Sequence, residues 1–158
     1  MLRLIPAPLH RALYRVAHRV RMIFWRIAKP QLQASWVIGR DIDGKLLLLR
    51  LSYGEGAWEL PGGGVGKAET PEDAARRELL EETGCEALAL AQVGVIEDTV
   101  AGAPSRNYIF TAMIEDHPVA DGREVIEARF FPTHSLPAPL SAKTQKRLDF
   151  HLSRKTKG

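Results

Sequence analysis

Three glutamates, Glu78, Glu81 and Glu82, lie close together in this chain of 158 residues. On a helix, spacings of three and four residues place such side chains on one face within a single turn. Like charges at that spacing repel one another, so a compensating cation is expected. A hard divalent ion such as Mg²⁺ takes oxygen ligands and commonly keeps waters and substrate phosphates. The cluster therefore indicates metal-dependent phosphate chemistry, while a solvated acidic face is the commoner meaning of three helical glutamates taken alone.

The residues before the glutamates favour the metal site. A glycine-rich loop is expected over residues 54–66, and glycines let a backbone approach a phosphate closely. A helix is expected from about Pro71 to Thr83. Thr70 suits its N-cap, and Gly84 suits its end. The glutamates should therefore lie on a short, well-defined helix that follows a loop able to contact phosphate.

Residues 63–85 resemble the Nudix box, G-x5-E-x7-R-E-U-x-E-E-x-G-U, in which U is a bulky apolar residue. The one departure is Cys85, a small hydrophobic residue at the final U. Residues 58–63, with the sequence WELPGG, also resemble the family's usual approach to the box. The eight positions that agree with the box are Gly63, Glu69, Arg77, Glu78, Leu79, Glu81, Glu82 and Gly84.

The resemblance implies an α/β fold, an α/β/α sandwich with a mixed β-sheet, from about residue 33 to the C-terminus. It also implies an enzyme that hydrolyses a phosphoanhydride bond in a nucleoside diphosphate linked to another group. The implied cofactor is Mg²⁺ or Mn²⁺. Such an ion polarises a phosphoryl oxygen and lowers the pKa of bound water.

The resemblance also assigns roles within the box. Arg77 would orient a glutamate through a salt bridge, Glu69 would support the site, and Gly63 would permit the turn of the loop. One of the box glutamates, or an acid outside the box, would deprotonate the attacking water. The implied catalytic residues are Glu78, Glu81, Glu82 and Arg77, of which the three glutamates would hold the metal.

Residues outside the box are further candidates. Glu97 follows an expected strand and is a candidate extra ligand or base, with a solvated loop acid as an equal alternative. Glu124 and Glu127 precede Phe130 and Phe131 and resemble a family strand entry, although surface charge is slightly favoured there. Candidate substrate-binding residues are Gly63, Gly64, Tyr53, Trp58 and Arg50.

The identity of the substrate stays open. The ADP-ribose group of the family often carries a proline about fifteen residues after the box, where this chain has Val100. The diadenosine-polyphosphate group often carries a tyrosine one or two positions later, where Ala101 and Gly102 stand. Two alternatives to the enzyme remain: a nucleotide-binding or sensing module with little turnover, and an RNA 5′-end pyrophosphohydrolase.

The hydrophobic pattern predicts the elements that must position these residues. An amphipathic helix is expected over residues 9–28, before the domain. Strands over 34–39 and 46–52 should form a hairpin, and the unbroken run Leu46–Leu49 predicts a strand that is covered on both faces. Further strands are expected over 88–96, 107–114 and 128–131, and a last helix over 141–151.

Charge divides the chain unevenly. Residues 1–30 carry a net charge of +7 with no acid, whereas residues 31–149 carry −7. We therefore expect a basic helical extension over residues 1–30 and a Nudix domain over residues 31–158.

The helix over 9–28 could pack on the domain, pair with a second chain, or contact an anionic membrane peripherally. A small-molecule nucleotide is the expected ligand, without stable nucleic-acid binding, and the single cysteine, Cys85, fits a cytoplasmic setting.

Overall fold

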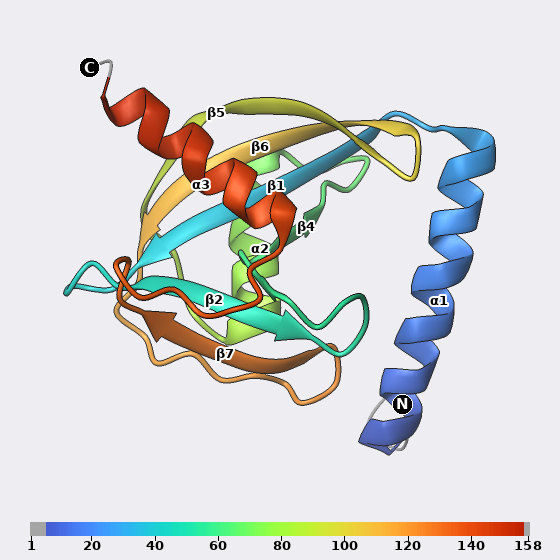
Figure 1. Ribbon diagram of the computed structural model, residues 1–158, viewed down its shortest axis with the longest axis horizontal. Helices are drawn as coiled ribbons and strands as arrows, with labels where there is room; N and C mark the ends of the chain where they lie inside the picture. Colours follow the sequence, from blue (N-terminus) through green and yellow to red (C-terminus); the bar gives the residue numbers. More distant parts are fainter. Residues whose placement is uncertain (1–5, 157–158) are drawn as a thin grey trace.

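A computed structural model describes residues 6–156. Its centre is a mixed seven-stranded sheet with the order β3-β2-β1-β6-β5, in which β4 pairs with β1 and β7 pairs with β2 (Figure 1). The strands β1 and β6 run parallel, and the other pairs are antiparallel. The elements are α1 (Ala7–Ala28), β1 (Leu32–Arg40), β2 (Leu46–Leu51), β3 (Trp58–Glu59), β4 (Gly62–Gly64), α2 (Pro71–Thr83), β5 (Leu88–Val100), β6 (Ala103–Met113), β7 (Val125–Phe131) and α3 (Ala142–Lys155).

Helices α2 and α3 cover opposite faces of the sheet (Figure 1). One buried cluster joins Leu79 of α2 to Val37 and Leu47 of the sheet. A second cluster joins Leu148 of α3 to Ile38 and other residues of the sheet. The expected α/β/α sandwich with a mixed sheet is therefore confirmed.

Strand β2 contributes to both clusters. Leu47 faces the α2 cluster, whereas Leu46 and Leu48 face the α3 cluster. All four leucines from Leu46 to Leu49 are at most 1% exposed. The prediction of a strand covered on both faces is confirmed, and it explains why the run does not alternate with polar residues.

The helix of the box has the expected ends. The Thr70 hydroxyl accepts a hydrogen bond from the Asp73 backbone N–H at 3.1 Å, and Gly84 adopts the left-handed conformation with φ of 70°. The expected loop over 54–66 is more ordered than predicted, because it contains β3 and β4. The expected strands over 88–96 and 107–114 extend into one long hairpin, which turns at Ala101 and Gly102 with positive φ at both residues.

Helix α1 lies beside the sandwich and not in either helical layer (Figure 1). Its polar face meets the domain: the Arg11 guanidinium donates to the Gly122 carbonyl oxygen at 2.7 Å, and the His18 and Tyr53 rings lie 4.9 Å apart. The apolar face that the sequence pattern identified is exposed instead. Among the described residues, no helix is long and apolar enough to cross a membrane.

We expect Leu48→Ala to lower the free energy of unfolding by about 3 kcal/mol, because it leaves a cavity in a fully buried site. Leu152→Ala is the matched control, since Leu152 is 55% exposed in α3 and its truncation should cost less than about 0.5 kcal/mol. Denaturant titration measures both values. Equal losses in the two variants would contradict the two-sided burial of β2.

Candidate functional site

The glycines of β4 bring the backbone against the box helix. Strand β4 pairs with β1, with Gly63 opposite Ser35. A Cβ atom at Gly63 would lie 2.6 Å from Glu78 Oε1, a distance that real side chains do not tolerate. Gly62 has φ of 151° and packs against the backbone of β1, where a side chain would also clash. Gly62 therefore needs to be glycine so that β4 can pair with β1, whereas a side chain at Gly63 would push the Glu78 carboxylate aside.

Glu82 is the most enclosed carboxylate of the box. It is 8% exposed, and the Gly62 backbone N–H donates a hydrogen bond to its Oε2 at 2.9 Å. Burial raises the pKa of Glu82 well above its usual value, and the nearby Glu78 and Glu124 carboxylates raise it further. The site therefore holds a buried acid whose charged form is disfavoured by its surroundings and would be stabilised by a nearby cation.

Arg77 forms hydrogen bonds with three glutamates of the box. Its guanidinium donates to Glu69 at 2.7 and 3.0 Å, to Glu78 at 2.8 Å and to Glu81 at 3.2 Å. It also donates to the Gly64 carbonyl oxygen at 3.0 Å, which links α2 to β4. These contacts hold the pKa of Glu69 down at about 2, since the Arg77 hydrogen bonds favour its charged form. Arg77 thus fixes the loop that leads into the helix.

The box carboxylates suit a divalent cation by their chemistry. Carboxylate oxygens are the ligands that hard divalent ions prefer, and the mutual repulsion of Glu78 and Glu82 favours such an ion. In the described part of the chain, no three His, Cys, Asp or Glu side chains are arranged so that they could hold a metal. Instead, Arg77 pairs with Glu78 and Glu81. If Glu78 and Glu81 are to hold an ion, as the resemblance implies, they would have to turn away from Arg77.

Glu124 joins the box from a different part of the chain. It lies just before β7, and the Tyr53 hydroxyl donates to its Oε1 at 2.9 Å. Its charge raises the pKa of both Glu78 and Glu82, so it lies within electrostatic reach of the box. The sequence pattern slightly favoured surface charge for Glu124, and only its place at a strand entry pointed to the site.

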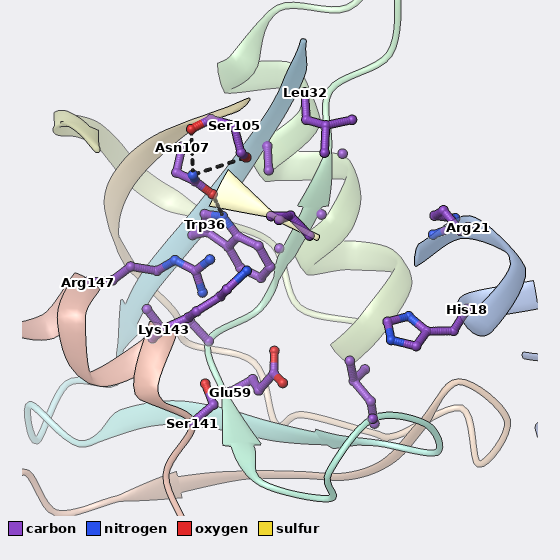
Figure 2. Close-up of a pocket in the computed structure, with 18 of the residues that line it drawn as sticks. His18, Arg21, Leu32, Trp36, Glu59, Ser105, Asn107, Ser141, Lys143 and Arg147 are labelled. Atoms are coloured by element: carbon purple, nitrogen blue, oxygen red, sulfur yellow. Dashed lines mark hydrogen bonds between the residues drawn. The ribbon is translucent and has the colours of Figure 1, made fainter. Parts of the chain in front are cut away.

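A cavity of about 680 Å³ adjoins the box, a volume typical of small-molecule sites. Glu82 and the glycines of β4 line it, as does Tyr53. Figure 2 shows two separate ends: Trp36, Lys143 and Arg147 lie on one side, and His18 and Arg21 lie on the other. The residues of the box therefore border a space that receives side chains from both α3 and α1.

The α3 end of the cavity combines an aromatic ring with a cation. The Arg147 guanidinium lies 3.7 Å from the centre of the Trp36 ring, and the Trp36 indole N–H donates to Asn107 at 2.9 Å. Arg147 is buried, which lowers its pKa to about 10, and its Nη1 has no hydrogen-bond partner among the described residues. This end can bind a planar ring that carries hydrogen-bond acceptors.

The candidate substrate-binding residues taken from the sequence include none from the α3 end. Asn107, Lys143 and Arg147 were missed, because no local motif marks them. Asn107 lies on β6 and the other two lie on α3, so only the tertiary fold brings them to the Trp36 ring.

The structure brings together only part of the candidate substrate-binding set. Gly63, Gly64 and Tyr53 line the cavity. Arg50 lies elsewhere, where it pairs with Glu127 and stacks 5.3 Å from the ring of Trp58. Trp58 is buried against Phe131, with the ring centres 4.8 Å apart. These two residues contribute to the fold because β2 and β3 direct them away from the cavity.

The candidate extra ligand Glu97 is also remote from the cavity lining. It is exposed on β5 and pairs with Arg106 at 2.7 Å across the β5–β6 hairpin. Of the acids proposed outside the box, Glu124 is therefore better placed than Glu97 to act with the box glutamates.

We expect Gly63→Ala to weaken the binding of Mn²⁺ by at least about tenfold, because the new methyl group displaces the Glu78 carboxylate. Isothermal calorimetry measures the affinity. Gly64→Ala is the matched control for metal binding, since the atom nearest to its new Cβ is the Gln33 carbonyl oxygen at 4.0 Å. Equal affinities in the two variants would show that metal binding does not depend on the space that Gly63 leaves beside Glu78.

Comparison with known proteins agrees with this geometry. The profile of the NUDIX domain matches residues 30–151. The crystal structure of a MutT NUDIX hydrolase from Burkholderia pseudomallei superposes with a TM-score of 0.68 at 25% identity, covering 76% of this chain and 97% of that one.

Two relatives carry names that describe an activity. A Bacillus subtilis (strain 168) protein, whose name proposes 8-oxo-dGTP diphosphatase activity, is 35% identical over 105 residues, which are 66% of this chain and 69% of that protein. An RNA pyrophosphohydrolase of Aeromonas hydrophila subsp. hydrophila is 40% identical over 67 residues, 42% of this chain and 33% of that protein. These similarities support pyrophosphohydrolase activity in a family whose members generally use divalent metal ions. The chain belongs to the Nudix hydrolase family.

Proposed function

We propose that this protein is a Mg²⁺- or Mn²⁺-dependent pyrophosphohydrolase, which cleaves a phosphoanhydride bond in a nucleoside diphosphate linked to another group. The observation that carries the proposal is the position of Glu82. This carboxylate is almost fully buried, is held by the Gly62 N–H, and borders the cavity that would receive the substrate. A buried acid at the edge of a cavity is the arrangement expected of a metal-binding catalytic group.

The residues of the box would share the chemistry. Glu78, Glu81 and Glu82 would hold the ion, which when bound polarises a phosphoryl oxygen and acidifies water. Arg77 would hold the loop at a fixed position relative to the helix through its contacts with Glu69 and Gly64. The proton of the attacking water would pass to a box glutamate or to Glu124.

The nucleoside would lie at the α3 end of the cavity. The Arg147 guanidinium covers one face of the Trp36 ring, so a base would stack on this pair by displacing Arg147 or by using the other face, and the Arg147 Nη1 has no partner among the described residues. The base-recognition role is supported by the relative whose name proposes 8-oxo-dGTP hydrolysis. Tyr53, Gly63 and Gly64 would line the path of the phosphates.

Hydrolysis of an RNA 5′ end is the second candidate function. The similarity to the Aeromonas RNA pyrophosphohydrolase favours it, and the +7 charge of residues 1–30 could attract a phosphate backbone. The −7 charge of residues 31–149 opposes a broad RNA-binding surface. A third candidate, a nucleotide-binding module with little turnover, is less favoured because the box is intact.

We also propose that the catalytic domain spans residues 31–158, that residues 1–30 form a basic helical extension, and that the protein acts in the cytoplasm. For the helix over residues 9–28, a second chain and the surface of a membrane are the two external partners that remain. Both would use the same exposed apolar face of α1.

Glu82→Gln should lower metal-dependent turnover by at least about a hundredfold, because the amide is a poor ligand for a hard ion. The variant should fold normally, since removing a buried negative charge relieves repulsion. Chromatography measures the nucleoside monophosphate, pyrophosphate or sugar phosphate formed from a panel of nucleoside triphosphates, nucleoside diphosphate sugars and 5′-triphosphorylated RNA. Thermal unfolding of the same samples measures stability.

Glu72→Gln is the matched control, because Glu72 lies on the same helix in an exposed pair with Arg76. It should retain the activity of the wild type. Wild-type protein without turnover on any substrate, yet with tight nucleotide binding, would make the chain a binding module. Faster turnover of triphosphorylated RNA than of free nucleotides would favour the RNA function.

A further inference from the structure

Helix α1 lies before the residues that match the NUDIX domain, yet it contacts the cavity of that domain. The family profile begins at residue 30, whereas α1 ends at Ala28. Four α1 residues nevertheless line the cavity that Glu82 and the β4 glycines border: His18, Arg21, Met22 and Trp25. The extension is therefore part of the wall of the site.

The polar face of α1 is held against two loops of the domain. At its N-terminal half, Arg11 Nε and Nη2 both donate to the Gly122 carbonyl oxygen, at 3.0 and 2.7 Å. In the middle, the rings of Tyr14 and His18 lie 6.3 and 4.9 Å from the ring of Tyr53. Since Tyr53 also donates to Glu124, these contacts connect α1 to the acids of the site.

The α1 end of the cavity is basic. Arg21 lies 5.9 Å from the Trp25 ring, and no Asp or Glu of residues 6–156 forms an ion pair with it. Helix α1 itself contains no acid. A guanidinium without a carboxylate partner, in a cavity wall, is suited to an anionic ligand such as a phosphate.

We propose that α1 completes the substrate site and that Arg21 binds a negatively charged phosphate on the side of the scissile bond away from the nucleoside. This inference rests on the proposed function, with the nucleoside at the α3 end. The two ends lie on opposite sides of the cavity (Figure 2). Arg21 is thus a specificity residue that selects substrates with an anionic distal group over those with a neutral one.

The test compares two substrates in Arg21→Ala: a nucleoside triphosphate, whose distal group is charged, and a nucleoside diphosphate glucose, whose distal group is neutral. We expect KM for the triphosphate to rise about tenfold with little change in kcat, and KM for the sugar nucleotide to stay within about twofold. Arg21→Lys should restore part of the preference, because it keeps the charge. Arg19→Ala is the matched control, since Arg19 is exposed and does not line the cavity.

Equal losses on both substrates would overturn the proposal and leave Arg21 a structural residue. Unchanged kinetics on both would overturn it as well. Calorimetry measures the affinity of wild-type protein and of Arg21→Ala for a non-hydrolysable nucleoside triphosphate. This measurement distinguishes failure of the Arg21 proposal from failure of the proposed enzymatic function. If wild-type protein binds the analogue without turning over any substrate, the enzyme proposal fails, and weaker binding by Arg21→Ala still supports the role of Arg21.

The opposite face of α1 supports a second, independent inference. Large apolar side chains form a continuous stripe there, and each is at least 50% exposed. Exposed arginines lie along one flank of the stripe, at positions 15, 19 and 26. The residues of the stripe are Leu9, Leu13, Val16, Val20, Ile23, Phe24 and Ile27.

We infer that this stripe docks on the surface of an anionic membrane. An apolar stripe flanked by cations, with no acid on the helix, matches the chemistry of a lipid interface, where acyl chains meet anionic head groups. The contacts that fix α1 to the domain use the other face of the helix, so docking leaves them intact. No helix of residues 6–156 can span a bilayer, so the attachment would be peripheral.

Sedimentation with vesicles tests this docking. Full-length protein should sediment with mixed phosphatidylglycerol–phosphatidylcholine vesicles and much less with phosphatidylcholine alone, and salt should weaken the binding. Val20→Asp should lower the bound fraction at least about fivefold, because it places a charge in the stripe. Ile42→Asp is the matched control, since Ile42 is 84% exposed in the β1–β2 turn and should have no effect.

Two results would overturn the membrane inference. One is wild-type protein that stays soluble beside anionic vesicles at low salt. The other is a dimer in light scattering that Val20→Asp converts to a monomer while vesicle binding is absent, which would assign the stripe to a second copy of the chain.

Discussion

The site depends on the close approach of β4 to α2, which gathers carboxylates that repel one another. Two features make the gathering possible. The Gly62 N–H neutralises part of the charge of Glu82, and Arg77 pairs with Glu69, Glu78 and Glu81. A side chain at Gly62 would clash with the backbone of β1 and so disturb the N–H that binds Glu82, and one at Gly63 would displace the Glu78 carboxylate. The steric requirement at Gly62 and the electrostatic requirement at Glu82 are therefore linked by one hydrogen bond.

Much of this arrangement is local and could be predicted from the sequence. The spacing of the glutamates, the Thr70 cap and the Gly84 end lie within one helix and its flanks, so short-range rules suffice. The run from Leu46 to Leu49 was also predicted from the sequence, since an unbroken apolar run of strand length fits a strand covered on both faces. The sandwich followed from the order of the elements and from the family resemblance.

The remaining parts of the site depend on tertiary placement. Arg147 reaches Trp36 because α3 crosses the sheet, and Glu124 reaches the box because its loop returns beside Tyr53. No spacing rule relates residues so far apart in the chain. The same cause explains why Trp58, next to the box in sequence, packs against Phe131 and not into the cavity. Proximity in sequence was a poor guide wherever a strand, with its alternating side chains, set the direction of the residue.

Helix α1 presents two faces with different roles. Its contacts with the domain are a few hydrogen bonds and ring contacts, each worth about 1 kcal/mol. On the opposite face, each large apolar side chain of the stripe would contribute about 1.5 to 3 kcal/mol on full burial. A partner that covers the stripe while the domain contacts stay in place adds its binding energy without moving the helix, because only a difference in affinity between two positions of α1 would shift it. Arg21 therefore keeps its place in the cavity wall when the stripe is covered.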